Sequence, residues 1–199
     1  MSNISDNIVV IQFAEAKPPI FKEVNGKKWV MYGEEDDYPQ YLLELFNKSA
    51  KHNAIIRSKV NYVIAKGFEL KVENESQSVS ASSLNWIKNV NRFGESLDSI
   101  AKKAAFDKEV YGGYCLEIVW RNDKTCEIFH ADYTKYRSNA DNTMFYYRKD
   151  GKFYGIKGSP EEIPAFDPSK RKGKQIIYYK DYRPGINTYT LPPYIGAIN

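Results

Sequence analysis

The stretch from Tyr32 to Val72 constrains the fold of this 199-residue chain more than any other part of the sequence. Pro39 follows four acidic residues, and proline is tolerated in the first turn of a helix because the amides there lack intrahelical partners. Ser49 is suited to cap a second helix by accepting from an amide one turn on, and Gly67 to end it in a left-handed conformation. The stretch therefore predicts two consecutive helices, followed by a strand over the alternating residues Phe68–Val72.

Apolar residues recur at helical spacing in both predicted helices, so each helix has one face directed at a core. A later predicted hairpin also alternates apolar and polar residues. We expect the core to contain Leu42, Leu45, Phe46, Ile56, Val60, Val63, Ile64, Leu116 and Ile118.

Two more helices are predicted before that hairpin. The first opens at Ser83 and ends near Gly94, and the second covers Ser96–Val110. Their apolar faces contain Leu84, Ile87 and Val90 in the first, and Leu97, Ile100, Ala101 and Ala104 in the second. Residues 74–83 are rich in serine and lack an apolar face, which predicts a mobile loop.

Turn residues divide most of the remaining chain into short strands. Gly112-Gly113 breaks the last helix, and Ser138–Asn142 is a further turn. The predicted strands are Ile20–Val24 and Lys28–Tyr32 around Asn25-Gly26, Tyr114–Arg121 and Thr125–His130 around Asn122–Lys124, Met144–Arg148 and Lys152–Ile156 around Asp150-Gly151, and Ile176–Asp181. The apolar run Ile8–Phe13 is either a strand or part of an arm over residues 1–19 that completes a neighbour's sheet.

Helices come mainly first and strands mainly later, which predicts an α+β fold with amphipathic helices followed by antiparallel β-hairpins. We expect one domain over residues 1–199. Hydrophobic residues make up 42% of the chain, which is typical of a folded protein. The 16 tyrosines suit surfaces that are partly wet and partly buried, such as subunit interfaces. There is no apolar run of membrane-spanning length and no signal-peptide pattern, so we expect a soluble protein of a reducing compartment without a membrane partner.

No group of residues predicts catalysis, a cofactor or a metal. His52 and His130 have no Cys, Asp or Glu at metal-ligand spacing, and we interpret both as ordinary histidines. The acids of Glu34–Asp37 are explained more simply by the positive end of a helix than by a metal. Cys115 and Cys126 lie on facing strands but not opposite each other, which favours buried thiols over a disulfide. There is no phosphate-binding glycine loop and no serine nucleophile elbow, so we name no site residues and expect no enzyme.

The charge distribution is uneven along the chain. The net charge of +4 is too weak to indicate nucleic-acid binding by itself. Residues 148–183 nevertheless hold ten basic and five acidic residues, whereas the first 45 residues lean acidic. A subunit with one acidic end and one basic end is suited to head-to-tail association in a ring, where unlike surfaces meet. The basic loop Lys170–Lys174 is either a solvated loop or a contact for DNA, and the sequence leaves both interpretations open.

Two parts of the sequence together resemble a known family. The run YGEEDDYPQYLLELFNKSAKHNAIIRSKVNYVIAKGF and the later patterns Tyr182–Gly185 and Tyr189–Ala197 are similar to the N-terminal part of portal proteins of tailed bacteriophages. Gly113–Arg121 and Tyr133–Arg137 fall between them in the expected order. Thr190 departs from the pattern, since the family more often has glycine there. The resemblance covers most of the chain from Phe21 to Ala197.

The resemblance implies a structural, non-enzymatic subunit of the ring at one capsid vertex, the conduit for DNA packaging and ejection. It implies the outer wing domain, without the stem, clip and channel loop, and hence an N-terminal fragment of a virion protein assembled in the bacterial host cytoplasm. Implied partners are further copies, in a ring of about twelve at full length, the terminase large subunit, the major capsid or scaffold protein, a head–tail connector protein and double-stranded DNA. An isolated fragment would leave an aromatic patch exposed, drawn from Tyr178, Tyr179, Tyr182, Tyr189 and Tyr194.

Two other functions remain open at this stage. A DNA-processing or replication-associated protein would use Lys170–Lys174 and the tyrosines to contact nucleic acid, but would need converging carboxylates or a catalytic tyrosine beside paired histidines. A host-side binding module would use an aromatic-rich sheet. The sequence specifies neither the phage and host nor the residues that contact DNA.

Overall fold

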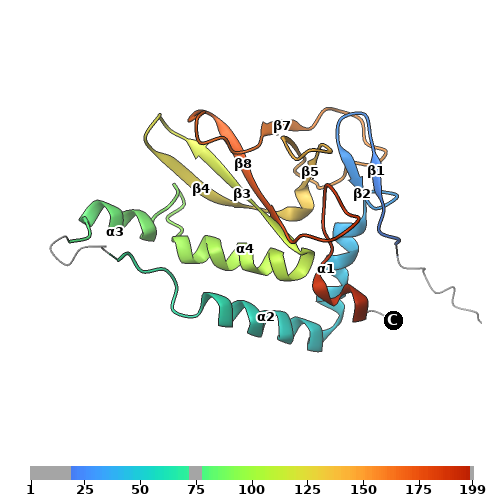
Figure 1. The fold of residues 1–199 in the computed structure, drawn as a ribbon, viewed down its shortest axis with the longest axis horizontal. Helices are drawn as coiled ribbons and strands as arrows, with labels where there is room; N and C mark the ends of the chain where they lie inside the picture. The colour runs from blue at the N-terminus through green and yellow to red at the C-terminus, as the bar shows by residue number, and fades with distance from the viewer. Residues whose placement is uncertain (1–18, 72–77, 198–199) are drawn as a thin grey trace, which may run out of the picture.

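The computed structural model describes residues 19–71 and 78–197, which form an α+β fold of four α-helices and antiparallel sheets (Figure 1). The helices are α1 (Tyr38–Lys48), α2 (Ala50–Ile64), α3 (Ala81–Lys88) and α4 (Leu97–Tyr111), with 3-10 turns η1 (Tyr133–Lys135) and η2 (Pro193–Ala197). The strands are β1 (Glu23–Asn25), β2 (Val30–Tyr32), β3 (Gly113–Trp120), β4 (Cys126–Ala131), β5 (Tyr136–Ser138), β6 (Met144–Tyr147), β7 (Glu161–Pro164) and β8 (Lys174–Lys180). The predicted α+β class with antiparallel sheets is confirmed, and one hairpin, β1-β2, precedes the helices.

The strands form three small sheets. β1 pairs with β2, a second sheet has the order β4-β3-β8, and a third has the order β5-β6-β7. A parallel bridge between Ala165 and Ile176 connects the second and third sheets. Figure 1 shows α4 beneath the β4-β3-β8 sheet and α2 beneath α4, so the helices form two further layers. None of the helices in the described ranges could cross a membrane.

Local chemistry explains most helix boundaries. Pro39 lies in the first turn of α1, as predicted. The Ser49 hydroxyl accepts from the His52 amide at 3.2 Å and caps α2, and Ser96 caps α4 in the same way. Gly112 ends α4 with φ +84°, a left-handed conformation that favours glycine.

The boundaries of α3 differ from the prediction. Ser80, not Ser83, caps this helix, because its hydroxyl accepts from the Ser83 amide at 3.1 Å. The helix therefore includes residues 81–83, which we had assigned to a mobile loop, and residues 74–77 of that loop lie outside the described chain. None of the α3 side chains is buried, and Val90 lies after the helix, where its carbonyl accepts from the Ile128 amide.

Two predicted strands are wrong. Residues 68–71 pair with no strand; the Phe68 amide instead donates to the Asp98 side chain at 2.8 Å, and Val72 is not described. Lys152–Ile156 is not the partner of β6, which pairs with β5 and β7. Phe153 is buried against Trp29, with ring centroids 5.6 Å apart, so its side chain contributes to packing and not to a ladder. The sequence had indicated neither β5 nor β7.

The other hairpins are confirmed. The Asn25-Gly26 pair marks a hairpin, although the loop spans residues 26–29 and is closed by the Gly26 amide and the Trp29 carbonyl at 2.9 Å. Cys115 lies opposite Ala131 and Cys126 opposite Trp120, so the two thiols are not paired. Ser138–Asn142 does connect β5 to β6. The predicted run Ile8–Phe13 lies outside the described residues.

The predicted core is largely confirmed. The buried members are Leu42, Phe46, Ile56, Val60 and Ile118, and the half-buried members are Leu45, Ile64 and Leu116. Val63 is wrong, since it is 65% exposed. Val63 lies in the last turn of α2. Beyond this turn the chain runs to the start of α4, where the Phe68 amide contacts Asp98, so no neighbouring element covers the Val63 side chain.

Candidate functional site

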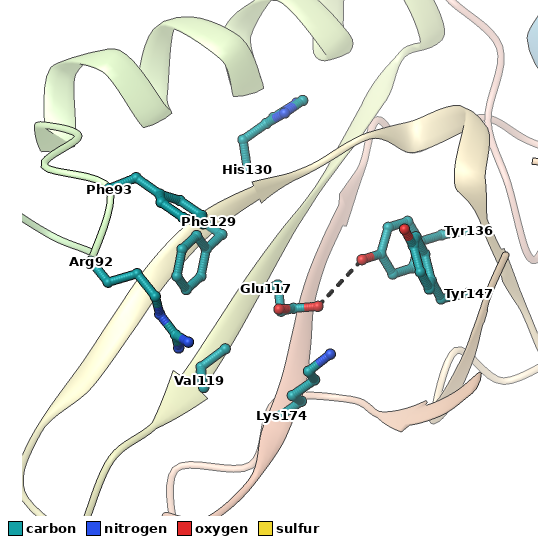
Figure 2. A pocket seen from close by; sticks show the side chains of 9 residues that line it. All are labelled: Arg92, Phe93, Glu117, Val119, Phe129, His130, Tyr136, Tyr147 and Lys174. Atoms are coloured by element: carbon teal, nitrogen blue, oxygen red, sulfur yellow. Dashed lines mark hydrogen bonds between the residues drawn. The ribbon is translucent and has the colours of Figure 1, made fainter. Parts of the chain in front are cut away.

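A groove of about 380 Å³ lies between the β4-β3-β8 sheet and the strands β5 and β6 (Figure 2). Its floor is formed by Glu117 and Val119, which alternate on one face of β3. In the register of the sheet, Glu117 is opposite Phe129 of β4, and Val119 is opposite Lys174 of β8. Antiparallel pairing therefore brings residues from three strands to one surface.

Two aromatic pairs form the walls of the groove. Phe93, from the loop after α3, meets Phe129 edge to face with ring centroids 5.7 Å apart. On the other wall, Tyr136 and Tyr147 have ring centroids 5.0 Å apart. Figure 2 shows the carboxylate of Glu117 between these two pairs. The groove thus places one charged group between four aromatic rings.

The cations around the groove are already held by acids. Arg92 donates to Glu127 from its Nε at 2.9 Å, and Arg121 donates to the other oxygen of Glu127 at 2.7 Å. The Lys174 amine lies 3.0 Å from a Glu161 oxygen. Each of these cations is therefore paired with a carboxylate of the protein itself.

Glu117 has a different environment. In the described chain, the only hydrogen bond of its carboxylate is with the Tyr136 hydroxyl, at the long distance of 3.4 Å. Burial, aided by the charge of Glu117, raises the pKa of Tyr136, so this hydroxyl stays protonated and can act as a donor. Glu117 is therefore the one carboxylate on the groove floor without a close ionic partner among the described residues.

His130 borders the groove and has a partner that the sequence did not reveal. Its Nε2 lies 2.8 Å from Asp107 of α4. Burial raises the pKa of Asp107, while its bond to His130 acts in the opposite direction. The pair joins α4 to β4. The second histidine, His52, packs its ring against Tyr194 with centroids 4.2 Å apart, which agrees with an ordinary packed histidine.

Both cysteines are free thiols, and Cys115 is buried. Burial raises the pKa of the Cys115 thiol well above its usual value, which disfavours the reactive thiolate. The pKa of Cys126 is also raised by burial. Within residues 19–71 and 78–197, no cluster of three His, Cys, Asp or Glu side chains could hold a metal ion.

The basic loop Lys170–Lys174 precedes β8 at the tip of the sheet. Lys170 pairs with Asp167 at 3.2 Å, and Arg171 donates to the Asp123 carbonyl at 3.4 Å. Arg171 also lies over the Trp120 ring, 5.9 Å from its centroid. The loop is exposed, but part of its charge is already matched.

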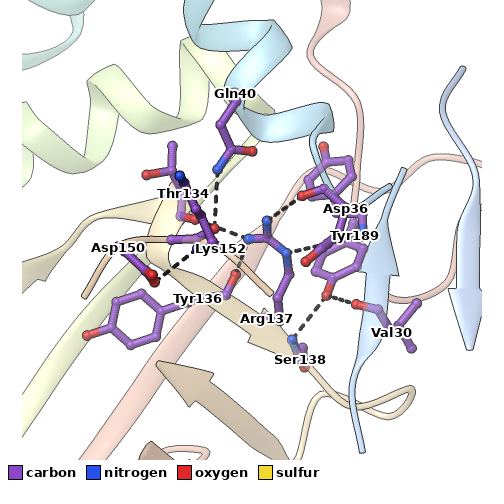
Figure 3. Close-up of polar contacts among 12 residues, drawn as sticks. Val30, Asp36, Gln40, Thr134, Tyr136, Arg137, Ser138, Asp150, Lys152 and Tyr189 are labelled. Atoms are coloured by element: carbon purple, nitrogen blue, oxygen red, sulfur yellow. Dashed lines mark hydrogen bonds and ion pairs between the residues drawn. The ribbon is translucent and has the colours of Figure 1, made fainter. Parts of the chain in front are cut away.

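The predicted acidic helix start is wrong for Asp36. This residue has φ +60° and turns inward, where its carboxylate accepts from the Tyr32 amide at 2.7 Å and from Arg137 Nε at 2.5 Å (Figure 3). Arg137 also donates to the Asp36 and Tyr136 carbonyls, at 2.9 and 2.8 Å. Both side chains are 0% exposed. Asp36 is therefore half of a buried ion pair that connects the start of α1 to β5, a pairing that no local pattern indicates.

The predicted exposed tyrosine patch is confirmed only for two residues. Tyr182 is 89% exposed and Tyr179 is exposed to a lesser degree. Tyr189 is buried beneath the first hairpin, and Tyr178 and Tyr194 are half-buried. These three rings pack into the chain's own core, so the C-terminal segment offers less free aromatic surface than expected.

Comparison of the chain with protein-family models finds no match, and a search of curated proteins finds no significant relative. The function must therefore be argued from the residues. The groove has a floor on β3, aromatic walls and one carboxylate without a close ionic partner among the described residues.

Proposed function

We propose that the chain is a structural subunit of a phage portal ring, corresponding to the N-terminal wing part of that family. In this role it would associate with further copies and form part of the conduit for viral DNA in the virion. Terminase, capsid or scaffold and connector proteins would dock on the complete ring. The proposal rests on the sequence resemblance and on the surface features described next.

The two segments that carry the resemblance form one structural unit. Tyr32, at the start of the first segment, stacks on Tyr189 of the second, and the Tyr32 hydroxyl donates to the Thr190 carbonyl. The Tyr194 hydroxyl donates to the Val110 carbonyl of α4 at 2.7 Å. If the two similar segments belong to one domain, they should contact each other in the fold. The contacts described here therefore support the proposal.

The observation that carries the proposal most directly is the outer surface of α2. Figure 1 shows α2 as the outermost helical layer. Ile55 and Tyr62 are seven residues apart on the same face, and both are more than half exposed, as is Val63 in the last turn. Exposed apolar side chains continue at Phe68 and Leu70. Apolar surface of this kind is typical of a subunit that is covered in its assembly.

The charge distribution supports head-to-tail contact between copies. Glu34, Glu35 and Asp37 are exposed before α1 and have no ion pair among the described residues. The basic loop Lys170–Lys174 lies at the opposite side of the molecule in Figure 1. Unlike surfaces at two ends of one subunit produce a heterologous interface, which closes into a ring when the rotation permits.

Electron microscopy and light scattering test the proposal. A gene product that includes stem and clip regions should form rings with a central channel, of about twelve subunits. Residues 1–199 alone should give monomers or low, concentration-dependent oligomers. Ile55→Glu combined with Tyr62→Glu should lower that association, whereas the matched change Tyr154→Glu on another exposed loop should not. Absence of rings from the longer product would contradict the proposal.

The second candidate is a nucleic-acid-binding protein that uses the tip of the β4-β3-β8 sheet. It is favoured by the exposed cations of Lys170–Lys174 beside Trp120, since cations and aromatic rings together suit nucleic acid. Fluorescence anisotropy with duplex DNA at two salt concentrations distinguishes it. Binding that is lost in Lys170→Glu with Lys172→Glu would favour this function, while we expect no measurable binding and no hydrolysis of ATP or DNA.

A further inference from the structure

The groove of Figure 2 has no role in the proposed ring. We propose that it is a binding site for the side chain of an arginine presented by a partner protein. Glu117 would pair with the guanidinium group, and the aromatic walls would cover its two faces. This inference does not depend on the proposed function, because it uses only the residues of the groove.

Charge determines the class of ligand. The positive charges at the groove are already matched, because Arg92 is paired with Glu127 and the Lys174 amine with Glu161. Glu117 has a spare acceptor capacity, because a carboxylate can accept about four hydrogen bonds and this one has a single long contact. A half-buried carboxylate with few partners favours a cationic donor over a neutral or anionic ligand.

The aromatic walls favour arginine over lysine. The Phe93–Phe129 pair and the Tyr136–Tyr147 pair lie on either side of the Glu117 carboxylate (Figure 2). A guanidinium group is planar, stacks on aromatic rings and donates two parallel bonds to a carboxylate, whereas an ammonium is a compact and strongly hydrated charge. An arginine of the chain already lies over one ring of these walls: the Arg92 guanidinium is 5.5 Å from the centroid of the Phe129 ring.

The size of the groove agrees with one side chain of a larger partner. Its volume of about 380 Å³ is near the lower end of the range for small-molecule sites, about 300–1,000 Å³. Phe93 is 75% exposed, so this ring can close over a ligand without breaking core contacts. An arginine could therefore enter from solvent while the rest of the partner remains outside.

Within this chain, Lys174 is the residue that would compete with a bound guanidinium for the Glu117 carboxylate. Its amine is bonded to Glu161, but the charge of Glu117 also acts on it and helps to raise the pKa of Lys174 against the opposing effect of burial. Glu161 thus provides an ion-pair partner for this amine beside the groove floor. If Glu161 is neutralised, Lys174 is expected to turn toward Glu117 and to occupy the position of the guanidinium.

Titration of the 199-residue protein with N-acetyl-arginine amide, followed by amide chemical shifts in NMR, tests the site. The matched probe is N-acetyl-citrulline amide, which has the same shape without the charge. We expect weak millimolar binding, with shifts at Glu117, Val119 and Phe129, and at least about tenfold weaker binding of citrulline. Equal binding of the two probes, or shifts elsewhere only, would overturn the proposal.

Four variants complete the test. Glu117→Gln should reduce affinity for the arginine probe about tenfold, and Glu44→Gln, a change of the same kind on α1, should leave it unchanged. Glu161→Gln should weaken binding several-fold through Lys174. Phe93→Ala keeps the fold, because the ring is exposed, and should also weaken binding several-fold. Unchanged affinity in both Glu117→Gln and Phe93→Ala would show that the groove does not bind arginine.

Discussion

The rings of Tyr32 and Tyr189 stack in parallel, with centroids 4.5 Å apart and 7° between their planes. Around them, the Tyr189 hydroxyl donates to the Val30 carbonyl and accepts from the Ser138 amide at 3.1 Å. The carboxylate of Glu23 accepts from three successive amides of the same C-terminal segment. The first hairpin and the end of the described chain therefore hold each other in place.

The first prediction concerns the Tyr189 hydroxyl. Tyr189→Phe keeps the stacked ring but leaves the Ser138 amide and the Val30 carbonyl without their partner in a buried site. We expect a loss of about 1–3 kcal/mol in the free energy of unfolding, measured by urea denaturation. Tyr182→Phe is the matched control, because Tyr182 is 89% exposed. Equal stability of the two variants would mean that the hydroxyl contacts contribute nothing.

The same contacts show what sequence patterns can and cannot predict. Helix caps such as Ser49 and Ser96 are local, since donor and acceptor are three residues apart. Ser49 was predicted as a cap, and Ser96 was predicted as the start of its helix. The partner of Tyr189 comes from a distant hairpin, so no periodicity reveals that this tyrosine is buried. Thr190 is likewise held by a contact that is not local to one turn, since its hydroxyl donates to the Asp181 carbonyl at 2.8 Å.

A second prediction compares two valines of α2. Val60 is 0% exposed, whereas Val63, three residues on and about 60° away around the helix, is 65% exposed. Val60→Asp places an unpaired charge in an apolar site and should cost about 3 kcal/mol or more. Val63→Asp should change stability by no more than about 0.5 kcal/mol, as is usual for exposed positions. Thermal melting of both variants measures the difference, and similar melting temperatures would show that the helix face is misplaced.

The third prediction concerns the buried pair of Asp36 and Arg137. Asp36→Asn keeps a side chain that tolerates the positive φ of this position, but it leaves the guanidinium without its counter-charge. Removing one partner of a buried ion pair costs about 3–5 kcal/mol. Glu35→Gln, next to it and exposed, should have little effect. Urea denaturation of the two variants tests this, and a stable Asp36→Asn protein would contradict it.

The groove could be predicted only in part. The alternation of β3 and β4 puts Glu117 and Phe129 on predictable faces of one hairpin. Tyr136 and Tyr147 arrive from the third sheet, and Phe93 from the loop after α3, so their meeting depends on tertiary packing. We assigned residues 152–156 instead of β7 to the strand beside β6, and that error concealed how the third sheet is built.

The last prediction is a pH dependence that originates at Glu127. Hydrogen bonds from Arg121 and then from Arg92 lower the pKa of Glu127 to about 2, although burial opposes them. Because the folded pKa lies below the ordinary value of about 4.5, the ionised form stabilises the fold. This contribution is fully present above pH 4.5 and is lost as the pH falls toward 2.

Glu127→Gln removes that titration. The variant should be less stable than the wild type at pH 6 by on the order of 1–2 kcal/mol, a value reduced because the two arginines are more than half exposed. At pH 2.5 most of the difference should have disappeared, since the unfolded carboxylate is then protonated and the pH lies close to the folded pKa of about 2. Urea denaturation of both proteins at several pH values measures the difference directly and cancels the titration of the other carboxylates. A difference that stays constant from pH 6 to pH 2.5 would show that the Arg121 and Arg92 contacts act on Glu127 without regard to its charge.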